Sequence, residues 1–153
     1  MIIEPELEFV FEATGRLGPP VTIGATPDGT RRIVPILSGP LEGPRIRGAL
    51  EGQGADWQLT RHDGVTVAEA LYAIRTHDGV VIQVHNKGLR RGPPEVMRRL
   101  ASGEEVDPAS YYFRTVADFT APMGPYDWMN KSIFVCSGAR SADGIRLRVW
   151  RVL

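Results

Sequence analysis

Short apolar runs separated by tight-turn signals follow one another along almost the whole chain. The turn signals are Pro27-Asp28-Gly29, Asp63-Gly64, Asp78-Gly79 and Asp143-Gly144. Flanking segments rich in Val, Ile, Leu and aromatic residues are typical of β-hairpins. The pattern predicts ten strands, near residues 6–13, 20–26, 31–37, 44–51, 56–62, 65–76, 79–87, 111–120, 131–140 and 145–152. One short helix is expected over residues 93–102, with a proline in its first turn and glycine after its end.

The first and last predicted strands alternate apolar residues with charged ones. The charged residues include Glu8 and Glu12 in the first strand and Arg146 and Arg148 in the last. Each strand should therefore bury one face, and opposite charges on the outer faces favour pairing of the two strands. Such pairing closes a long antiparallel meander and removes its exposed edges. We predict an all-β chain in which residues 1–153 form a single antiparallel β-barrel of about ten strands.

The segment from residue 111 to residue 120 alternates in a way that matters for function. Tyr111, Phe113, Thr115, Ala117 and Phe119 share one face, and Tyr112, Arg114, Val116 and Asp118 share the other. A face that carries Tyr, Arg and Asp is either solvated or gathered around a ligand.

Composition excludes several classes of protein. The 153 residues suit one domain, and the 18 basic residues balance the 18 acidic ones, so no net field attracts nucleic acid or an anionic membrane. The local cluster Arg90-Arg91 is interpreted as part of a solvated face. No apolar run has bilayer length, and the acidic start lacks the basic region of a signal peptide, so we expect a cytoplasmic protein.

Metal and cofactor motifs are not found in the sequence. A single cysteine, Cys136, excludes an internal disulfide and a cysteine zinc site, and the three histidines lack ligand spacing. No Gly-rich loop opens a helix, and no serine lies in a nucleophile elbow. We therefore expect neither a metal nor a cofactor.

Asp56 and Trp57 follow a glycine-rich turn. Asp56 can act as a base or bind a substrate hydroxyl, and Trp57 can form the wall of an aromatic pocket. A turn-capping aspartate and a core tryptophan are an equally good interpretation.

Two further pairs of residues can carry chemistry. Tyr72 and Arg114 can polarise a carbonyl or hold a carboxylate, or else form an internal hydrogen-bond network that only specifies the barrel. His85 and Asn86 end a predicted strand near the barrel mouth, where His85 can shuttle a proton or simply be solvated.

Trp128 and Asn130 share one face if residues 127–131 are extended. Pointing inward beside Tyr112 and Arg114, they would make an aromatic pocket with several donors, suited to a planar oxygenated ligand. The alternative is that Trp128 caps the barrel end. The pocket is favoured because polar groups recur on several strands.

Three segments together resemble the family DUF3237, also called UPF0311: SGPLEGPRIRGALEGQGADWQLTRHDG, LYAIRTHDGVVIQVHNKGLRRGPPEVMRRLASGEEVDP, and YYFRTVADFT with YDWMNKSIFV. The resemblance implies a lipocalin-like antiparallel barrel that is often oligomeric. A fungal relative is associated with cofactor-free hydroalkoxylation, in which a phenol oxygen adds to an alkene. Where family members commonly have an Asp-Ala-Arg-Tyr-like strand, this chain has Glu69-Ala70-Leu71-Tyr72 and lacks the arginine.

Two classes of function follow. The first is a cofactor-independent cyclase, isomerase or hydroalkoxylation-type lyase for a phenolic or polyketide-like molecule, with Asp56 or Glu69 as base and with Tyr72 and Arg114 holding the enolate. The second is a small-molecule carrier or sensor without turnover, or a structural or interaction protein with a filled interior. An acid inside the pocket with a raised pKa favours the enzyme. The expected partners are a small, aromatic ligand and a second copy of the chain.

Overall fold

The structure is a computed structural model that describes residues 1–153. Its strands are β1 (Leu7–Arg16), β2 (Val21–Thr26), β3 (Gly29–Ile36), β4 (Gly39–Glu42), β5 (Arg47–Leu50), β6 (Gly54–Arg61), β7 (Thr66–Thr76), β8 (Val81–Arg91), β9 (Tyr112–Thr120), β10 (Ile133–Ser141) and β11 (Gly144–Val152). The helices are α1 (Pro94–Ala101) and two short 3-10 helices, η1 (Pro108–Ser110) and η2 (Asp127–Lys131). The single α-helix lies within the predicted range of residues 93–102. None of the helices has the length and apolar character of a membrane-spanning segment.

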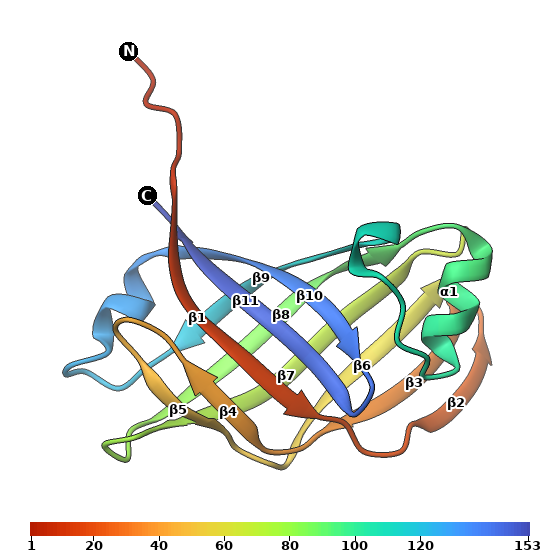
Figure 1. Cartoon of the computed structure of the whole chain (residues 1–153), viewed down its shortest axis with the longest axis horizontal. Coiled ribbons are helices and arrows are strands. Elements are labelled where there is room, and N and C mark those ends of the chain that lie inside the picture. Colours follow the sequence, from red (N-terminus) through yellow and green to blue (C-terminus); the bar gives the residue numbers. More distant parts are fainter.

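The strands form a closed antiparallel barrel, as the sequence predicts (Figure 1). Around the barrel the order is β7-β5-β4-β1-β11-β10-β9-β8, and pairing of β7 with β8 closes the ring. β7 branches on its other side: its first half pairs with β6, and its last residues pair with β5. β3 and β2 continue outward from β6.

The branch returns to the barrel wall at the end of β3. Leu17 and Ile36 form an isolated bridge, and the amide of Gly18 donates to the carbonyl of Pro35 at 2.9 Å. β6 and β3 therefore span the space between β7 and the end of β1. At this end of the barrel, β6 and β3 therefore form an additional part of the wall around the interior.

Pairing of the first and last strands is confirmed. β1 and β11 are antiparallel, with Glu12 opposite Arg148. Arg146 and Arg148 donate to the two carboxylate oxygens of Glu12 at 2.6 and 2.5 Å. The hydrogen bonds from the two arginines lower the pKa of Glu12.

One strand was missed by the sequence analysis. The strand expected over residues 44–51 is β5 alone, and β4 precedes it in a segment whose Gly-Pro pairs look like turns. A Cβ atom at Gly39 would lie 1.7 Å from the carbonyl oxygen of Thr14. Glycine at this position is therefore what lets β4 approach β1 so closely.

The expectation of an extended segment at residues 127–131 is wrong, because these residues form η2. The side-chain amide of Asn130 accepts from the amide of Ala121 at 2.8 Å and donates to its carbonyl at 2.9 Å. These two bonds occupy the backbone groups that follow β9, where a strand partner would otherwise bind.

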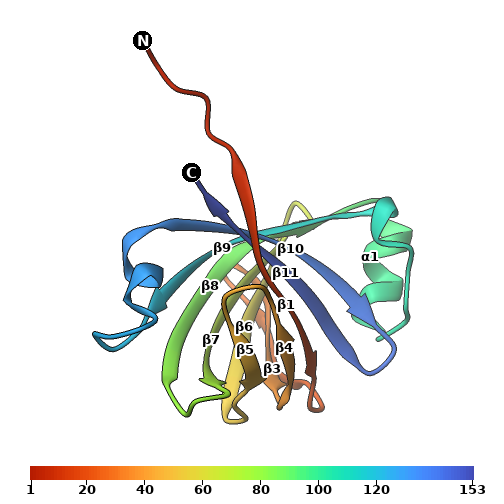
Figure 2. The same cartoon turned by 60° about the vertical axis from the view of Figure 1, so that its left-hand side comes forward.

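Two apolar clusters fill different parts of the interior. The larger has 21 buried residues, among them Phe11, Phe119 and Phe134, whose rings pack edge to face. The smaller joins Leu100 of α1 to Ala68, Val106, Tyr111 and Phe113. Figure 2 shows α1 lying against one side of the barrel, where its apolar face forms this second cluster.

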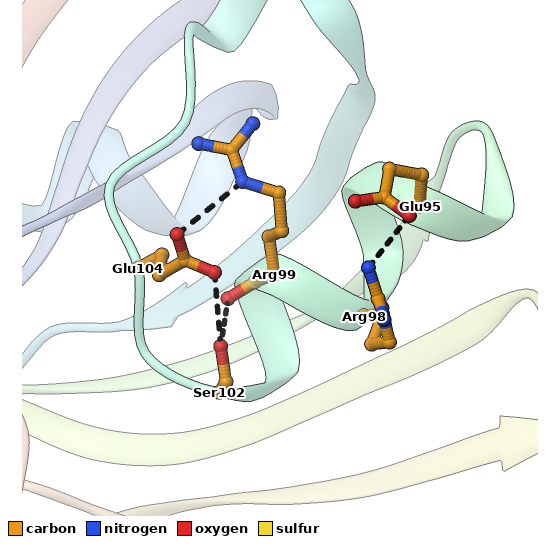
Figure 3. A network of polar contacts seen from close by, with 5 residues as sticks. All are labelled: Glu95, Arg98, Arg99, Ser102 and Glu104. Carbon is orange, nitrogen blue, oxygen red and sulfur yellow. Dashed lines mark hydrogen bonds and ion pairs between the residues drawn. The ribbon is translucent and has the colours of Figure 1, made fainter.

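A polar network holds the last turn of α1 (Figure 3). Arg99 donates to Glu104 at 3.4 Å, and the Ser102 hydroxyl donates to the Arg99 carbonyl at 2.8 Å. Arg98 pairs with Glu95 one turn earlier at 2.6 Å. Each exposed pair contributes little stability, but together they fix where the chain leaves the helix and returns to β9.

Candidate functional site

A partly open cavity lies between the two apolar clusters. Its volume is about 70 Å³, which is room for roughly five waters. Eleven of its 17 lining residues are hydrophobic. The other six are polar or charged: Asp56, Gln58, Asn86, Arg90, Thr115 and Arg140. Tyr72, one of the eleven, adds a phenol hydroxyl.

Asp56 is the only acidic residue of this lining. It projects inward from β6, opposite Val34 of β3 and Ala70 of β7 in the sheet. Its Oδ2 accepts from the amide of Gln58 at 2.7 Å, and its Oδ1 accepts from the backbone amide of Glu69 at 2.8 Å. Gln58 is fixed in turn by Arg32, whose Nε donates to its Oε1 at 2.8 Å.

Burial raises the pKa of the Asp56 carboxyl. The two hydrogen bonds and the charges of Arg90 and Arg32 act in the opposite direction but do not cancel the effect of desolvation. A carboxyl of this kind binds a proton more readily than an exposed aspartate, which is the property expected of an acid–base group.

Tyr72 and Asn86 are also brought to the cavity, as the sequence analysis proposed for Tyr72. Both are buried, with 8% and 6% of their surface exposed. Burial raises the pKa of the Tyr72 phenol, so this hydroxyl keeps its proton and can donate a hydrogen bond. Ala70 lies between Asp56 and Asn86 in the sheet and leaves space for a ligand between them.

Several buried polar atoms of the lining have no partner within the protein. They are Oδ1 of Asn86, Nε of Arg90, Oγ1 of Thr115 and Nε of Arg140. Only one other buried side-chain nitrogen or oxygen in the chain has no hydrogen bond, Oε1 of Glu8 on β1, and this atom forms ion pairs with Arg45 and Arg151. Because an unpaired buried polar group costs free energy, their concentration in one cavity makes this cavity the candidate site.

Arg114 and Tyr112 do not reach the cavity. Alternate residues of β9 are exposed, and these two lie on its outer face, along a groove with Lys87, Val116 and Trp150. Arg114 donates to the carbonyl of Phe113 at 2.9 Å, and its guanidinium lies 5.4 Å from the centre of the Tyr112 ring. The expected partnership of Arg114 with Tyr72 is therefore absent, because residues 113 and 115 face inward instead.

Trp57, Glu69 and His85 also lie on the outer face. Trp57 follows Asp56 on β6 and is 53% exposed, so it is not a core residue. The imidazole of His85 lies 3.1 Å from a Glu69 carboxylate oxygen, and the Lys87 ammonium lies 3.8 Å from the other. The hydrogen bond with His85 lowers the pKa of Glu69, which leaves it poorly suited to act as a base at neutral pH.

Trp128 and Asn130 lie outside the cavity lining. Trp128 packs against the larger apolar cluster beside Phe134, and the guanidinium of Arg45 lies 3.9 Å from the centre of its ring. Asn130 is committed to the backbone of Ala121. The barrel-capping interpretation of Trp128 therefore describes the arrangement better than the pocket does.

Sequence reasoning missed most of the polar lining, in particular Gln58, Arg90, Thr115 and Arg140. Arg90 was interpreted as solvated, but it is 7% exposed and lies opposite Phe113 inside the barrel. The alternation of inward and outward side chains along a strand could have revealed these residues, because Asn86, Gly88 and Arg90 share one face of their strand. Phe113 and Thr115 likewise share one face of theirs.

No group of three or more His, Cys, Asp or Glu residues is arranged to hold a metal ion.

Solved structures share this barrel. A protein of unknown function from Rhodopseudomonas palustris superposes with a TM-score of 0.93 at 40% identity, covering 99% of this chain and 100% of that one. A β-barrel-like protein from Acinetobacter baumannii AYE gives 0.87 at 32% identity, covering 100% and 99%. An enzyme from Penicillium herquei gives 0.76 at 21% identity, covering 100% and 98%, and this likeness shows the fold alone.

Sequence comparison gives the same relationship. The UPF0311 protein of Rhodopseudomonas palustris (strain ATCC BAA-98 / CGA009) is 42% identical over 148 residues, which is 97% of each chain. The family model described as protein of unknown function (DUF3237) matches residues 5–152. The resemblance seen in the sequence is thereby confirmed, and the chain belongs to the DUF3237 family, whose curated members carry the name UPF0311.

Proposed function

We propose that the cavity binds a small organic molecule and that Asp56 transfers a proton on it without a cofactor. The observation that carries the proposal is a single carboxyl, with a pKa raised by burial, in a mainly apolar cavity. A raised pKa is useful to an acid–base catalyst and unnecessary for a carrier.

The reaction class follows from the groups beside Asp56. The Asp56 carboxylate takes a proton from a carbon next to a carbonyl, or from a phenol hydroxyl, and returns it at another position. The protonated Tyr72 hydroxyl donates a hydrogen bond to the oxygen that becomes negative. Isomerisation, cyclisation and addition of a phenol to an alkene all need these two actions, so a phenolic or polyketide-like substrate suits the cavity.

Asp56 is a better candidate for this role than Glu69. Glu69 lies on the outer face, paired with His85 and Lys87, and its pKa is lowered. Its backbone amide still matters, because it donates to Asp56 Oδ1 and fixes the direction of the carboxyl. That the Penicillium herquei protein of the same fold is called an enzyme is consistent with catalysis by such a barrel.

Proton exchange tests the proposal without knowledge of the natural substrate. The protein is incubated in D₂O with para-hydroxyphenylacetone, and loss of the signals of the protons next to the carbonyl is followed by ¹H NMR. We expect exchange above the buffer rate for the native protein and for Glu69→Gln, and the buffer rate for Asp56→Asn. Circular dichroism verifies that both variants are folded.

A carrier or sensor gives a different result. The apolar cavity and its unpartnered donors would bind the ketone, which is visible as changes in the protein chemical shifts, while proton exchange stays at the buffer rate. Exchange that persists in Asp56→Asn would contradict the assignment of the base.

A further inference from the structure

The charges around the cavity are unbalanced. The guanidinium groups of Arg32, Arg90 and Arg140 lie close enough to influence one another, and Asp56 is the only carboxylate among them. Three positive charges against one negative charge in a mainly apolar cavity are costly, because a buried cation loses water and a single carboxylate does not compensate all three. The site therefore lacks negative charge.

Arg90 carries most of this imbalance. It is 7% exposed, its Nε is buried without a hydrogen-bond partner, and its guanidinium lies 5.7 Å from the centre of the Phe113 ring. No ion pair in the chain includes Arg90 or Arg140. Burial and the charge of Arg32 lower the pKa of Arg90 to about 10, so the group is still charged at neutral pH.

Arg32 is already committed, in contrast to the other two arginines. Its Nε donates to Gln58, and its NH1 lies 3.4 Å from the carbonyl of Ala101 at the end of α1. Arg90 and Arg140 therefore remain as free donors.

We propose that the ligand of this cavity is a small organic carboxylate, whose carboxylate group binds Arg90 and Arg140 while its apolar body lies against Val34, Ala70 and Leu147. The planar fork of a guanidinium matches a carboxylate with two parallel hydrogen bonds. A phosphate fits less well, because it brings no apolar body to the hydrophobic wall of the cavity. The inference rests on the proposed function only in that both use the same cavity.

The substrate class of the proposed reaction follows. A ligand with its carboxylate at Arg90 has its remaining atoms in the cavity that Tyr72 and Asp56 also line, and these are the groups that would move the proton. The structure thus favours an aromatic or unsaturated acid over a neutral phenol as substrate.

Binding of benzoate and of its neutral isostere benzamide tests the proposal by isothermal titration and protein NMR. We expect benzoate to bind the native protein about tenfold more tightly than benzamide or inorganic phosphate, as a single carboxylate–guanidinium pair would give. Arg90→Met should abolish this preference. Arg91→Met is the matched control, because Arg91 is the next residue of β8 and lies on its outer face over Tyr112.

Two further readouts separate this site from a structural arginine and from the proposed catalysis. Removing an unpaired buried cation should leave the unfolding temperature of ligand-free Arg90→Met equal to or above that of the native protein, whereas loss of a structural arginine would lower it. Asp56→Asn should bind benzoate at least as tightly as the native protein, even where proton exchange is lost.

Equal binding of benzoate and benzamide, no binding of benzoate, or an unchanged preference in Arg90→Met would each overturn the carboxylate site. None of these results depends on whether Asp56 transfers a proton. Conversely, normal benzoate binding with no proton exchange would remove the catalytic proposal and leave a carrier of organic acids.

Discussion

Gly138 of β10 lies directly against the ring of Phe113 on β9. A Cβ atom at residue 138 would lie 2.8 Å from two carbons of that ring, which is closer than carbon atoms pack. Phe113 lines the cavity. Because Gly138 has no side chain, the Phe113 ring can lie back against β10 and leave the cavity space free.

Gly138→Ala should therefore destabilise the protein by about 1–3 kcal/mol, because the added methyl group overpacks the wall. Chemical denaturation with urea measures this change. The displaced Phe113 ring should also narrow the cavity and weaken benzoate binding. Gly52→Ala is the control, because no atom lies within 4 Å of the added Cβ. Gly24→Ala is unsuitable, because the φ of +107° at Gly24 would strain an alanine. Equal stability of the two variants would contradict the close contact.

Asp56 should make the stability of the barrel depend on pH in a direction opposite to that of most aspartates. Burial raises its folded-state pKa above the ordinary value of 3.8, so over the interval between the two values the folded protein holds more protons than the unfolded chain. The stability of the native protein should then fall, relative to Asp56→Asn, as the pH rises through this interval. Above the folded-state pKa, the difference in the free energy of unfolding between the native protein and Asp56→Asn should be constant.

Urea unfolding of the two proteins from about pH 3 to about pH 8 gives this difference directly. Use of the difference removes the effects of the other carboxyl groups, which are common to both proteins. A difference that rises with pH would mean that the hydrogen bonds from Gln58 and Glu69 outweigh desolvation, and the argument for Asp56 as an acid–base group would lose its basis.

The sequence predicted the hairpins and the barrel closure well, because both rest on local signals. Tight turns such as Asp78-Gly79 mark where the chain reverses, and the charges of Glu12 and Arg146 mark strands that pair. The branch at β7 was not foreseen, because the Asp63-Gly64 turn indicates only that β6 pairs with β7. The pairings of β7 with β5 and of β6 with β3 join segments farther apart in the chain, and no local signal marks them. β4 was missed because Gly39 and Gly43, at its two ends, look like turn residues. In the structure these glycines instead let the backbone pass close to β1.

The candidate site was predicted in part for a related reason. Alternation on β9 correctly separates two faces, but composition alone does not state which face is inside. The polar face with Tyr112 and Arg114 was favoured as a pocket, whereas the barrel buries the face with the larger apolar surface, and Thr115 and Phe113 come with it. Arg90 was missed because an arginine that is buried without an ion pair is rare, so a sequence pattern favours the solvated interpretation.

Glu12→Gln should destabilise the closure of the barrel by about 1 kcal/mol at neutral pH, since it removes two partly exposed ion pairs between β1 and β11. The folded-state pKa of Glu12 lies below the ordinary 4.5, so this stabilisation is present above that value and is lost as the pH falls through the folded-state pKa.

Urea unfolding at low and high salt measures the effect of Glu12→Gln, and the difference from the native protein should shrink at high salt because exposed charges are screened. Glu6→Gln is the control, because Glu6 precedes the same strand and forms no ion pair. An equal loss of stability in both variants would mean that net charge, and not the closing contact, is responsible.

Ala70→Leu should close the cavity while the barrel stays folded. Ala70 lies between Asp56 and Asn86 and points inward, so a larger side chain there occupies the ligand space instead of displacing packed atoms. We expect benzoate binding to weaken by at least about tenfold and the free energy of unfolding to change by less than about 1 kcal/mol. Ala73→Leu on the outer face of β7 should leave binding unchanged. Binding that survives in Ala70→Leu would place the ligand elsewhere, with the outer groove at Tyr112 and Arg114 as the next site to examine.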